Sequence, residues 1–487
     1  MPGNELRIVV IGAGMAGMLA GIKLREAGFN DVTLYEKADR VGGTWRDNTY
    51  PGLTCDVPSH HYTYTFERNP DWTRHLPPGP EIQAYFERTA ERYGLSELTR
   101  FNTEVTSAVY ENGRWQLSLS DNTNTHADIV IAATGVLHHP RTPDIAGIDS
   151  FAGDLFHSAQ WDHSIPLDGR RIGIVGNGST GVQIISALAG RAERLVHFQR
   201  TPQWIMPVEN GHYTEEQRAR FRDDPAALLE EMNIEQYTAN VERYTLAITE
   251  MEAEASQIMG DACLMNLEHG VTDPELREKL RPDHKPLCKR LIFSPDYYQA
   301  IQHPRSHLVR EAIDHIEPGG IRTSDGELHE LDVIVLATGF HADAFMRPMR
   351  ITGRAGVELN DYWADRPRAY LAITMPDFPN LFMLNGPNGP VGNFSLIDIA
   401  EHQWQYISQL IERVQSGSAC EVSVSTAAME AFERERIAAA RHTVWYLGGC
   451  QSWYLDAQGI PASWPWNYSR FVSEMSAPKW DHFDMRK

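Results

Sequence analysis

The sequence contains the same strand–glycine–helix unit twice. In each copy an apolar run predicts a buried parallel strand, three glycines follow as G-x-G-x-x-G, and a helical pattern then ends at another glycine. The glycines are Gly12, Gly14 and Gly17 in the first copy and Gly176, Gly178 and Gly181 in the second. Such glycines let the backbone approach a pyrophosphate, which the N–H groups at the helix start bind. Two copies predict an α/β fold with two dinucleotide-binding, Rossmann-like domains.

The residue that ends the second strand differs between the two copies. Glu36 lies 24 positions after Gly12, and Arg200 lies 24 positions after Gly176. A carboxylate at this place accepts hydrogen bonds from ribose hydroxyls, whereas an arginine suits a 2′-phosphate. The first site is therefore predicted to take FAD or NAD, and the second NADP. The alternative is that both residues are ordinary solvated charges at strand ends, and the equal spacing argues against it.

A second repeat and a glycine-free stretch divide the chain further. Residues 128–135 and 332–339 are both apolar runs that end in A-T-G, one after each glycine motif. Residues 213–258 lack glycine and carry an apolar stripe at helical spacing from Val241 to Ile258, which predicts an inserted helical subdomain with a buried face. We expect an FAD-binding domain over 1–140 and 336–487, with a C-terminal loop region in its second part. An NADP-binding domain over 141–208 and 284–335 would surround a helical insert over 209–283.

Composition excludes several classes of partner. With 44 Lys and Arg against 65 Asp and Glu, the net charge of −21 argues against nucleic acid, which basic proteins bind. No signal peptide and no apolar run long enough to span a bilayer is visible, so we expect a cytoplasmic protein with no membrane contact. The 5 cysteines are scattered without a C-x-x-C pair, so they are expected to be reduced thiols. Neither cysteine nor histidine spacing predicts a metal site.

Two further motifs carry a family resemblance. Residues 42–56 match [A/G]-G-x-W-x4-[F/Y]-P-[G/M]-x3-D at every fixed position, from Gly42 to Asp56. Residues 151–162 match F-x-G-x3-H-x3-W-[P/D], and include His157 and Trp161. The chain resembles the type I Baeyer–Villiger monooxygenases, a branch of the class B flavoprotein monooxygenases. The resemblance spans nearly the whole chain and is weakest in the helical insert.

The resemblance implies an NADPH-dependent, FAD-containing monooxygenase. In this family a flavin peroxide formed with O₂ attacks a ketone, which becomes an ester or a lactone. That chemistry needs a fixed positive charge beside the developing anions, in a site shielded from water. Arg290 matches the family's arginine and Asp56 the acid that positions it; by local sequence alone they would be a surface charge and a turn-forming aspartate. We therefore expect Arg290 and Asp56 to be the catalytic pair.

The resemblance also assigns cofactor-binding residues outside the glycine motifs. His157 and Trp161 are expected to couple the domains and place the cofactors rather than to make bonds. Trp453 resembles a mobile-loop tryptophan that covers the nicotinamide cofactor, although a buried core position is an alternative for it. The remaining assignments are Gly43, Thr44, Trp45 and Tyr62 for FAD, with Glu36, and Ser179, Thr180, Thr201 and Lys289 for NADP, with Arg200.

Other activities stay open at this stage. The nearest is oxidation of sulfur or nitrogen in a small substrate by the same flavin peroxide. A disulfide reductase of similar architecture needs a redox-active cysteine pair, which the spacing does not provide, and a nucleotide-sensing flavoprotein would not need Asp56 and Arg290. The sequence names neither the ketone nor the regioselectivity, and it leaves monomer and homodimer open.

Overall fold

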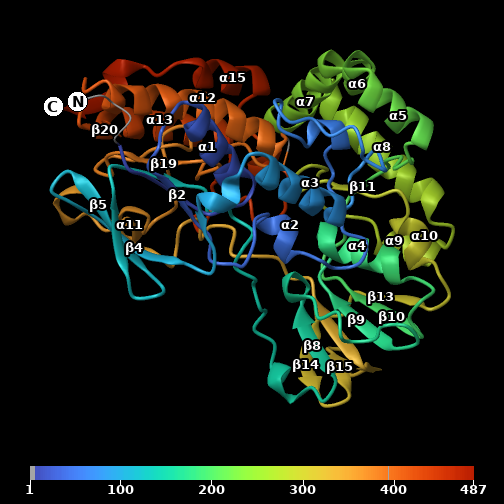
Figure 1. Ribbon diagram of the computed structural model, residues 1–487. Helices are drawn as coiled ribbons and strands as arrows, with labels where there is room; N and C mark the ends of the chain where they lie inside the picture. Colours follow the sequence, from blue (N-terminus) through green and yellow to red (C-terminus); the bar gives the residue numbers. More distant parts are fainter. Residues whose placement is uncertain (1–5, 393) are drawn as a thin grey trace.

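Two five-stranded parallel sheets organise the computed structural model, which describes residues 6–392 and 394–487 (Figure 1). The first sheet has the order β19-β7-β1-β2-β3, formed by Leu381–Met383, Ile129–Ala132, Ile8–Ile11, Val32–Tyr35 and Thr99–Arg100. The second has the order β13-β10-β9-β17-β8, formed by Ser306–Val309, Arg194–Phe198, Arg171–Val175, Val333–Leu336 and Asp154–His157. Strands β1, β7 and β17 are buried along their whole length, as expected for strands covered on both faces.

The two sheets repeat one arrangement. Each glycine motif joins a central strand to a helix: β1 to α1 (Met15–Glu26), and β9 to α4 (Ser179–Leu188). The strand that ends in A-T-G, β7 or β17, pairs with the central strand on its other side. The duplicated unit in the sequence thus folds into equivalent strands with equivalent neighbours, as predicted.

The outermost strand beside each A-T-G strand comes from a different part of the chain. In the first sheet it is β19, which follows the whole second sheet in sequence, whereas in the second it is β8, which precedes the glycine motif. The first sheet is therefore discontinuous in sequence, and the second lies between its parts. The two chain crossings run side by side, where Pro140 bridges Phe340 and the His341 N–H donates to the His139 carbonyl.

The remaining strands of the described residues form smaller sheets. One has the order β18-β4-β5-β6, formed by Arg350–Thr352, Val105–Glu111, Arg114–Leu119 and Asn124–Ala127. Antiparallel β14-β15-β16 covers Ile313–Glu317, Gly320–Thr323 and Leu328–Glu330. The pairs are β11 (Ile205–Met206) with β12 (Ile292–Phe293), and β20 (Glu421–Val424) with β21 (Phe483–Arg486).

The helices between residues 209 and 283 follow one another in sequence as one group; most lie at the upper right of Figure 1, and α9 lies lower on the right. They are α5 (Glu215–Asp223), α6 (Pro225–Met232), α7 (Ile234–Thr249), α8 (Glu254–Gly270) and α9 (Pro274–Lys279). The β11–β12 pair brings together the two chain ends that flank this group. The apolar stripe predicted there is only partly buried, because the chain breaks between α7 and α8: Ile248 is buried, but Ile258 is 52% exposed.

The other helices pack around the sheets. In Figure 1, α12, α13 and α15 lie at the upper left, and α12 contacts both α1 and α15. Their bounds are α2 Thr44–Asp47, α3 Gly79–Arg92, α10 Tyr297–Ile301, α11 Leu359–Tyr362, α12 Leu396–Gln415, α13 Thr426–Ala440, α14 Val444–Leu447 and α15 Tyr468–Ser476. Of the helices in residues 6–392 and 394–487, none is long and apolar enough to cross a bilayer.

Candidate active site

The two residues expected to act in catalysis are in contact, although 234 positions separate them in sequence. Arg290 precedes β12, and Asp56 lies in the loop after α2. The Arg290 Nη2 donates to Asp56 Oδ2 at 2.5 Å, and less than a third of each side chain is exposed. Burial alone would lower the pKa of Arg290, but the Asp56 carboxylate outweighs it and the pKa is raised. The guanidinium is thus a permanent positive charge that Asp56 holds in one orientation.

Tyr454 is a third member of this group that the sequence did not indicate. Its buried hydroxyl lies close to the Arg290 guanidinium. Gly392 lies against both: a Cβ there would stand 2.1 Å from the Tyr454 hydroxyl and 3.0 Å from Arg290 Nη1. Tyr454 follows Trp453 directly, so the only sequence signal was its position beside an assigned residue.

The first glycine motif and the first fingerprint meet at one place. A Cβ on Gly43 would stand 3.1 Å from the Gly14 Cα, so the two backbones pass each other closely. Gly43 precedes Thr44, which begins α2. The Trp45 Nε1 donates to the Tyr62 hydroxyl at 2.9 Å, and the two rings meet edge to face. The structure therefore gathers the residues assigned to FAD around the start of α1.

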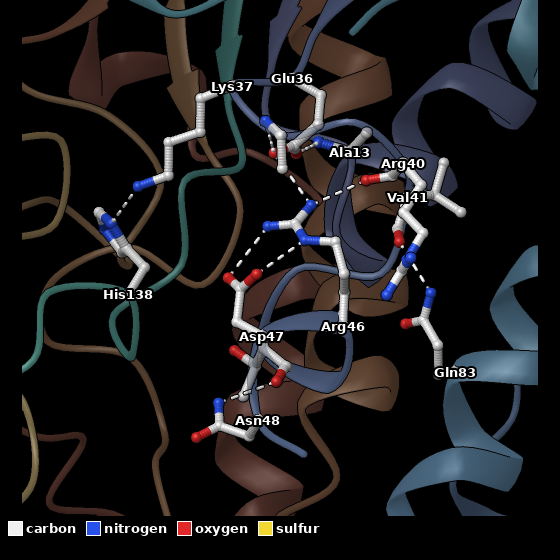
Figure 2. Close-up of polar contacts among 12 residues, drawn as sticks. Ala13, Glu36, Lys37, Arg40, Val41, Arg46, Asp47, Asn48, Gln83 and His138 are labelled. Atoms are coloured by element: carbon white, nitrogen blue, oxygen red, sulfur yellow. Dashed lines mark hydrogen bonds and ion pairs between the residues drawn. The ribbon is translucent and has the colours of Figure 1, made fainter. Parts of the chain in front are cut away.

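Glu36 is buried at the end of β2, with only 4% of its surface exposed (Figure 2). Its carboxylate accepts the Ala13 N–H at 2.8 Å and lies 3.0 Å from Arg46 Nη1. Arg46 also donates two hydrogen bonds to Asp47, at 2.7 and 3.0 Å. The alternative of a solvated charge is wrong for Glu36. Arg46, a variable position of the fingerprint, is a buried partner that the sequence did not indicate.

In the second glycine motif, the middle glycine faces open space and the last glycine is tightly packed. A Cβ on Gly178 would have no atom within 4 Å, whereas one on Gly181 would stand 2.1 Å from the Gly176 carbonyl oxygen. Gly178 precedes α4, whose first residues are Ser179 and Thr180. Gly181 thus allows α4 to pack on β9, and Gly178 leaves room at the helix start, where N–H groups bind phosphate.

Arg200 and Lys289 come together beyond the end of β10. Arg200 is exposed and Lys289 is half-buried. Burial lowers the pKa of Lys289, and the positive charge of Arg200 lowers it further. The carbonyl of Thr201, the next residue, accepts from the Asn177 amide inside the glycine motif. Two cations that repel each other beside a glycine-rich turn form a ready site for an anionic group.

The first fingerprint also reaches the second sheet. The Tyr50 hydroxyl donates to Gln183 on α4 at 2.9 Å and accepts from Thr180 at 3.3 Å. In the second fingerprint, the His157 Nε2 donates to the Gly339 carbonyl at 3.0 Å, beside the chain crossing. The Trp161 ring packs on Phe156. The first motif therefore contacts the second sheet region through α4, whereas the contacts of the second motif lie within the second sheet region, next to the chain crossing.

The loop of Trp453 corrects one prediction about the cysteines. Cys288 is bonded to Cys450, with the two Cα atoms 6.1 Å apart, so only Cys55, Cys263 and Cys420 are free. The expectation of 5 reduced thiols is wrong for this pair. Spacing rules detect local cysteine pairs, whereas the fold brings these two together across 162 positions.

Trp453 is 46% exposed and stacks on Tyr454, with ring centroids 4.3 Å apart. The alternative of a buried core aromatic is therefore wrong for it.

In the described part of the chain, no group of 3 or more His, Cys, Asp or Glu side chains could hold a metal ion.

Known proteins with similar sequences are monooxygenases. Residues 10–76 match the family described as NAD(P)-binding Rossmann-like domain. An uncharacterized monooxygenase of Mycobacterium tuberculosis is 47% identical over all of this chain and 97% of its own length. A Baeyer–Villiger monooxygenase of Streptomyces coelicolor is 35% identical over 97% of this chain and 91% of its own.

Solved structures agree over the whole chain. Cyclohexanone monooxygenase from Rhodococcus sp. Phi1, bound to NADP⁺, has 30% identity and a TM-score of 0.87, with 99% of both chains covered. OTEMO in complex with FAD and NADP has 28% identity, the same TM-score and the same coverage. The duplicated nucleotide-binding fold, the Arg290–Asp56 contact and these similarities lead to one conclusion. The chain belongs to the Baeyer–Villiger monooxygenase family.

Proposed function

We propose that this protein uses NADPH and O₂ to convert a ketone into an ester or a lactone. The observation that carries the proposal is the Arg290–Asp56 contact, 2.5 Å long and largely shielded from solvent, beside Tyr454 and Gly392. A guanidinium keeps its proton across the physiological pH range, so it stabilises an anion without neutralising it. Charges that are already in place when the anion forms stabilise it without any reorganisation and so increase the reaction rate.

FAD fits the site around the start of α1. Gly14 and Gly43 leave two backbones without side chains at the helix start, where a pyrophosphate binds. Glu36, fixed by Arg46 and the Ala13 N–H, keeps further lone pairs for ribose hydroxyls. When bound, FAD takes up a hydride from NADPH and activates O₂.

NADPH fits the second site. Gly12 and Gly17 for FAD, and Gly176 and Gly181 for NADPH, support their helices in the same way. The open space at Gly178 admits the pyrophosphate beside Ser179 and Thr180, and Arg200, Thr201 and Lys289 surround the 2′-phosphate. A phosphate between Arg200 and Lys289 relieves the repulsion that lowers the Lys289 pKa. Trp453, which is exposed, is the residue assigned to cover the cofactor.

We also propose that the FAD-binding domain covers residues 1–140 and 336–487, and that the NADP-binding domain covers 141–208 and 284–335 around an insert at 209–283. The proposed location is cytoplasmic, and the proposed active form is a monomer or a homodimer. Within this arrangement Arg290 precedes β12, which pairs with β11 where the chain enters and leaves the insert, and it contacts Asp56 of the first fingerprint.

A product screen tests the function. The purified FAD-loaded protein is incubated with NADPH, O₂ and a panel of linear, cyclic and aryl ketones, and the products are identified by mass spectrometry. We expect an ester or lactone that carries one oxygen atom from ¹⁸O₂. NADPH oxidation that yields only hydrogen peroxide across the panel would contradict the proposal.

A further inference from the structure

The Cys288–Cys450 disulfide joins the segment that contains Arg290 to the segment that contains Trp453 and Tyr454. Cys288 stands two positions before Arg290, and Cys450 stands four positions before Tyr454, whose hydroxyl lies with Arg290 beside Gly392. The disulfide therefore joins the two segments at one point, and Arg290 and Tyr454 bring them close together at a second. Trp453 lies between these points and is exposed.

Residues 448–454 carry Trp453 and Tyr454, and their other backbone hydrogen bonds to residues farther along the chain lie at the two ends of this segment. The Lys285 N–H donates to the Gly448 carbonyl at 3.0 Å, and the Ala462 N–H donates to the Tyr454 carbonyl at 2.8 Å. Tyr454 also stacks on Trp445, with ring centroids 4.9 Å apart. The disulfide is thus a covalent tie in the middle of a segment that is otherwise held at its two ends.

We propose that Cys288–Cys450 is a redox modification site whose state sets how firmly the loop of Trp453 and Tyr454 is held against Arg290. Its reductant is a dithiol, and its oxidant is hydrogen peroxide. The disulfide form holds the loop closed, and the dithiol form releases it. The proposal that this affects oxygen transfer rests on the proposed function, whereas the tie itself does not.

The chemistry of the switch balances with these reagents. A thiolate of the dithiol attacks the Sγ of Cys450, which is half-buried, while Cys288 is fully buried and leaves as the thiolate. The second thiol of the reagent then displaces Cys450, so two electrons and two protons pass to the protein and the reagent becomes a disulfide. In the reverse direction Cys450 takes an oxygen from hydrogen peroxide, and one water leaves. Attack by Cys288 then closes the bond and releases a second water.

Thiol counting and hydrogen exchange test the tie on the FAD-loaded protein. Denatured in an alkylating reagent, the oxidised protein should label 3 cysteines, which are Cys55, Cys263 and Cys420, and the protein treated with dithiothreitol should label all 5. Amide exchange over residues 449–454 should become about tenfold faster on reduction. Five labelled cysteines before reduction, or unchanged exchange after it, would overturn the proposal.

Two variants separate the tie from general effects of reduction. Cys450→Ser should show the fast exchange without reductant; it is preferred to a change at the fully buried Cys288. Cys420→Ser, which removes an exposed free thiol, should behave as the unmodified protein does in both states. The ester formed per NADPH is then compared between the oxidised and reduced forms, and we expect less ester and more hydrogen peroxide after reduction. An equal yield in both forms would overturn the effect on oxygen transfer, whereas no ester in either form would contradict the proposed function and leave the exchange result standing.

Discussion

Replacing Lys289 with methionine should weaken NADPH binding and leave NADH binding nearly unchanged. Lys289 is half-buried, and both burial and the positive charge of Arg200 lower its pKa. A hydrogen bond from a charged group contributes about 1.5–3 kcal/mol, which corresponds to about a 10- to 150-fold increase in the NADPH dissociation constant. Arg200 is exposed, so Arg200→Gln should cost about 0.2–1 kcal/mol, or up to about fivefold.

The assay is flavin reduction under anaerobic conditions, followed by stopped-flow absorbance at increasing NADPH or NADH. The dissociation constant of each nucleotide comes from the dependence of the rate on its concentration. Lys285→Met is the matched control, because Lys285 is an exposed lysine in the same loop. Equal losses for NADPH and NADH in Lys289→Met, or a larger loss in Arg200→Gln than in Lys289→Met, would refute the assignment of the 2′-phosphate site.

Three other predictions follow from the same contacts. Because its pKa is lowered, Lys289 loses its charge at a lower pH than an ordinary lysine does. The NADPH dissociation constant should therefore rise as the pH increases through that pKa, and in Lys289→Met the dissociation constant should not change over the same pH range. Gly178→Ala should keep the melting temperature and weaken NADPH binding, whereas Gly181→Ala, whose Cβ would stand 2.1 Å from a carbonyl oxygen, should lower the melting temperature; the reverse pattern in thermal denaturation would be inconsistent with the packing. Arg46→Ala leaves Glu36 buried without its cation, at a cost of about 3–5 kcal/mol, so the purified protein should contain less FAD by absorbance; full FAD content would argue against this pair as a support of the site.

The duplicated nucleotide-binding unit was predictable because its signals are local. The strand before each glycine motif is a short apolar run, and each motif is followed by a helix, so β1, α1, β9 and α4 can be placed from the sequence. The equal spacing of Glu36 and Arg200 reflects the equal lengths of the two units. The family resemblance added the Arg290–Asp56 pair, which no local pattern indicates.

The contacts that were not predicted join distant parts of the chain. The Cys288–Cys450 bond spans 162 positions, and Arg290 and Tyr454, from the same two segments, lie close together beside Gly392. Periodicity and spacing describe neighbours along the chain, so they give no account of which loops the fold brings together. The prediction of a buried helical stripe was wrong in part for a related reason. The helical spacing of its residues continues across the break between α7 and α8, and Ile258 is exposed.

The most direct test of the central claim compares ketone and sulfide oxidation in the unmodified protein and in Arg290→Ala. The rates of ester, sulfoxide and hydrogen peroxide formation are measured per flavin at saturating NADPH. Removal of a preorganised charge costs about 10²–10³ in rate, so ester formation should fall by about that factor, with the NADPH oxidised appearing as hydrogen peroxide. Sulfoxide formation should fall much less, because a sulfide attacks the oxygen itself and needs no stabilised anion. Ester formation at an unchanged rate in Arg290→Ala, or an equal loss of both products, would contradict the role of the Arg290–Asp56 pair.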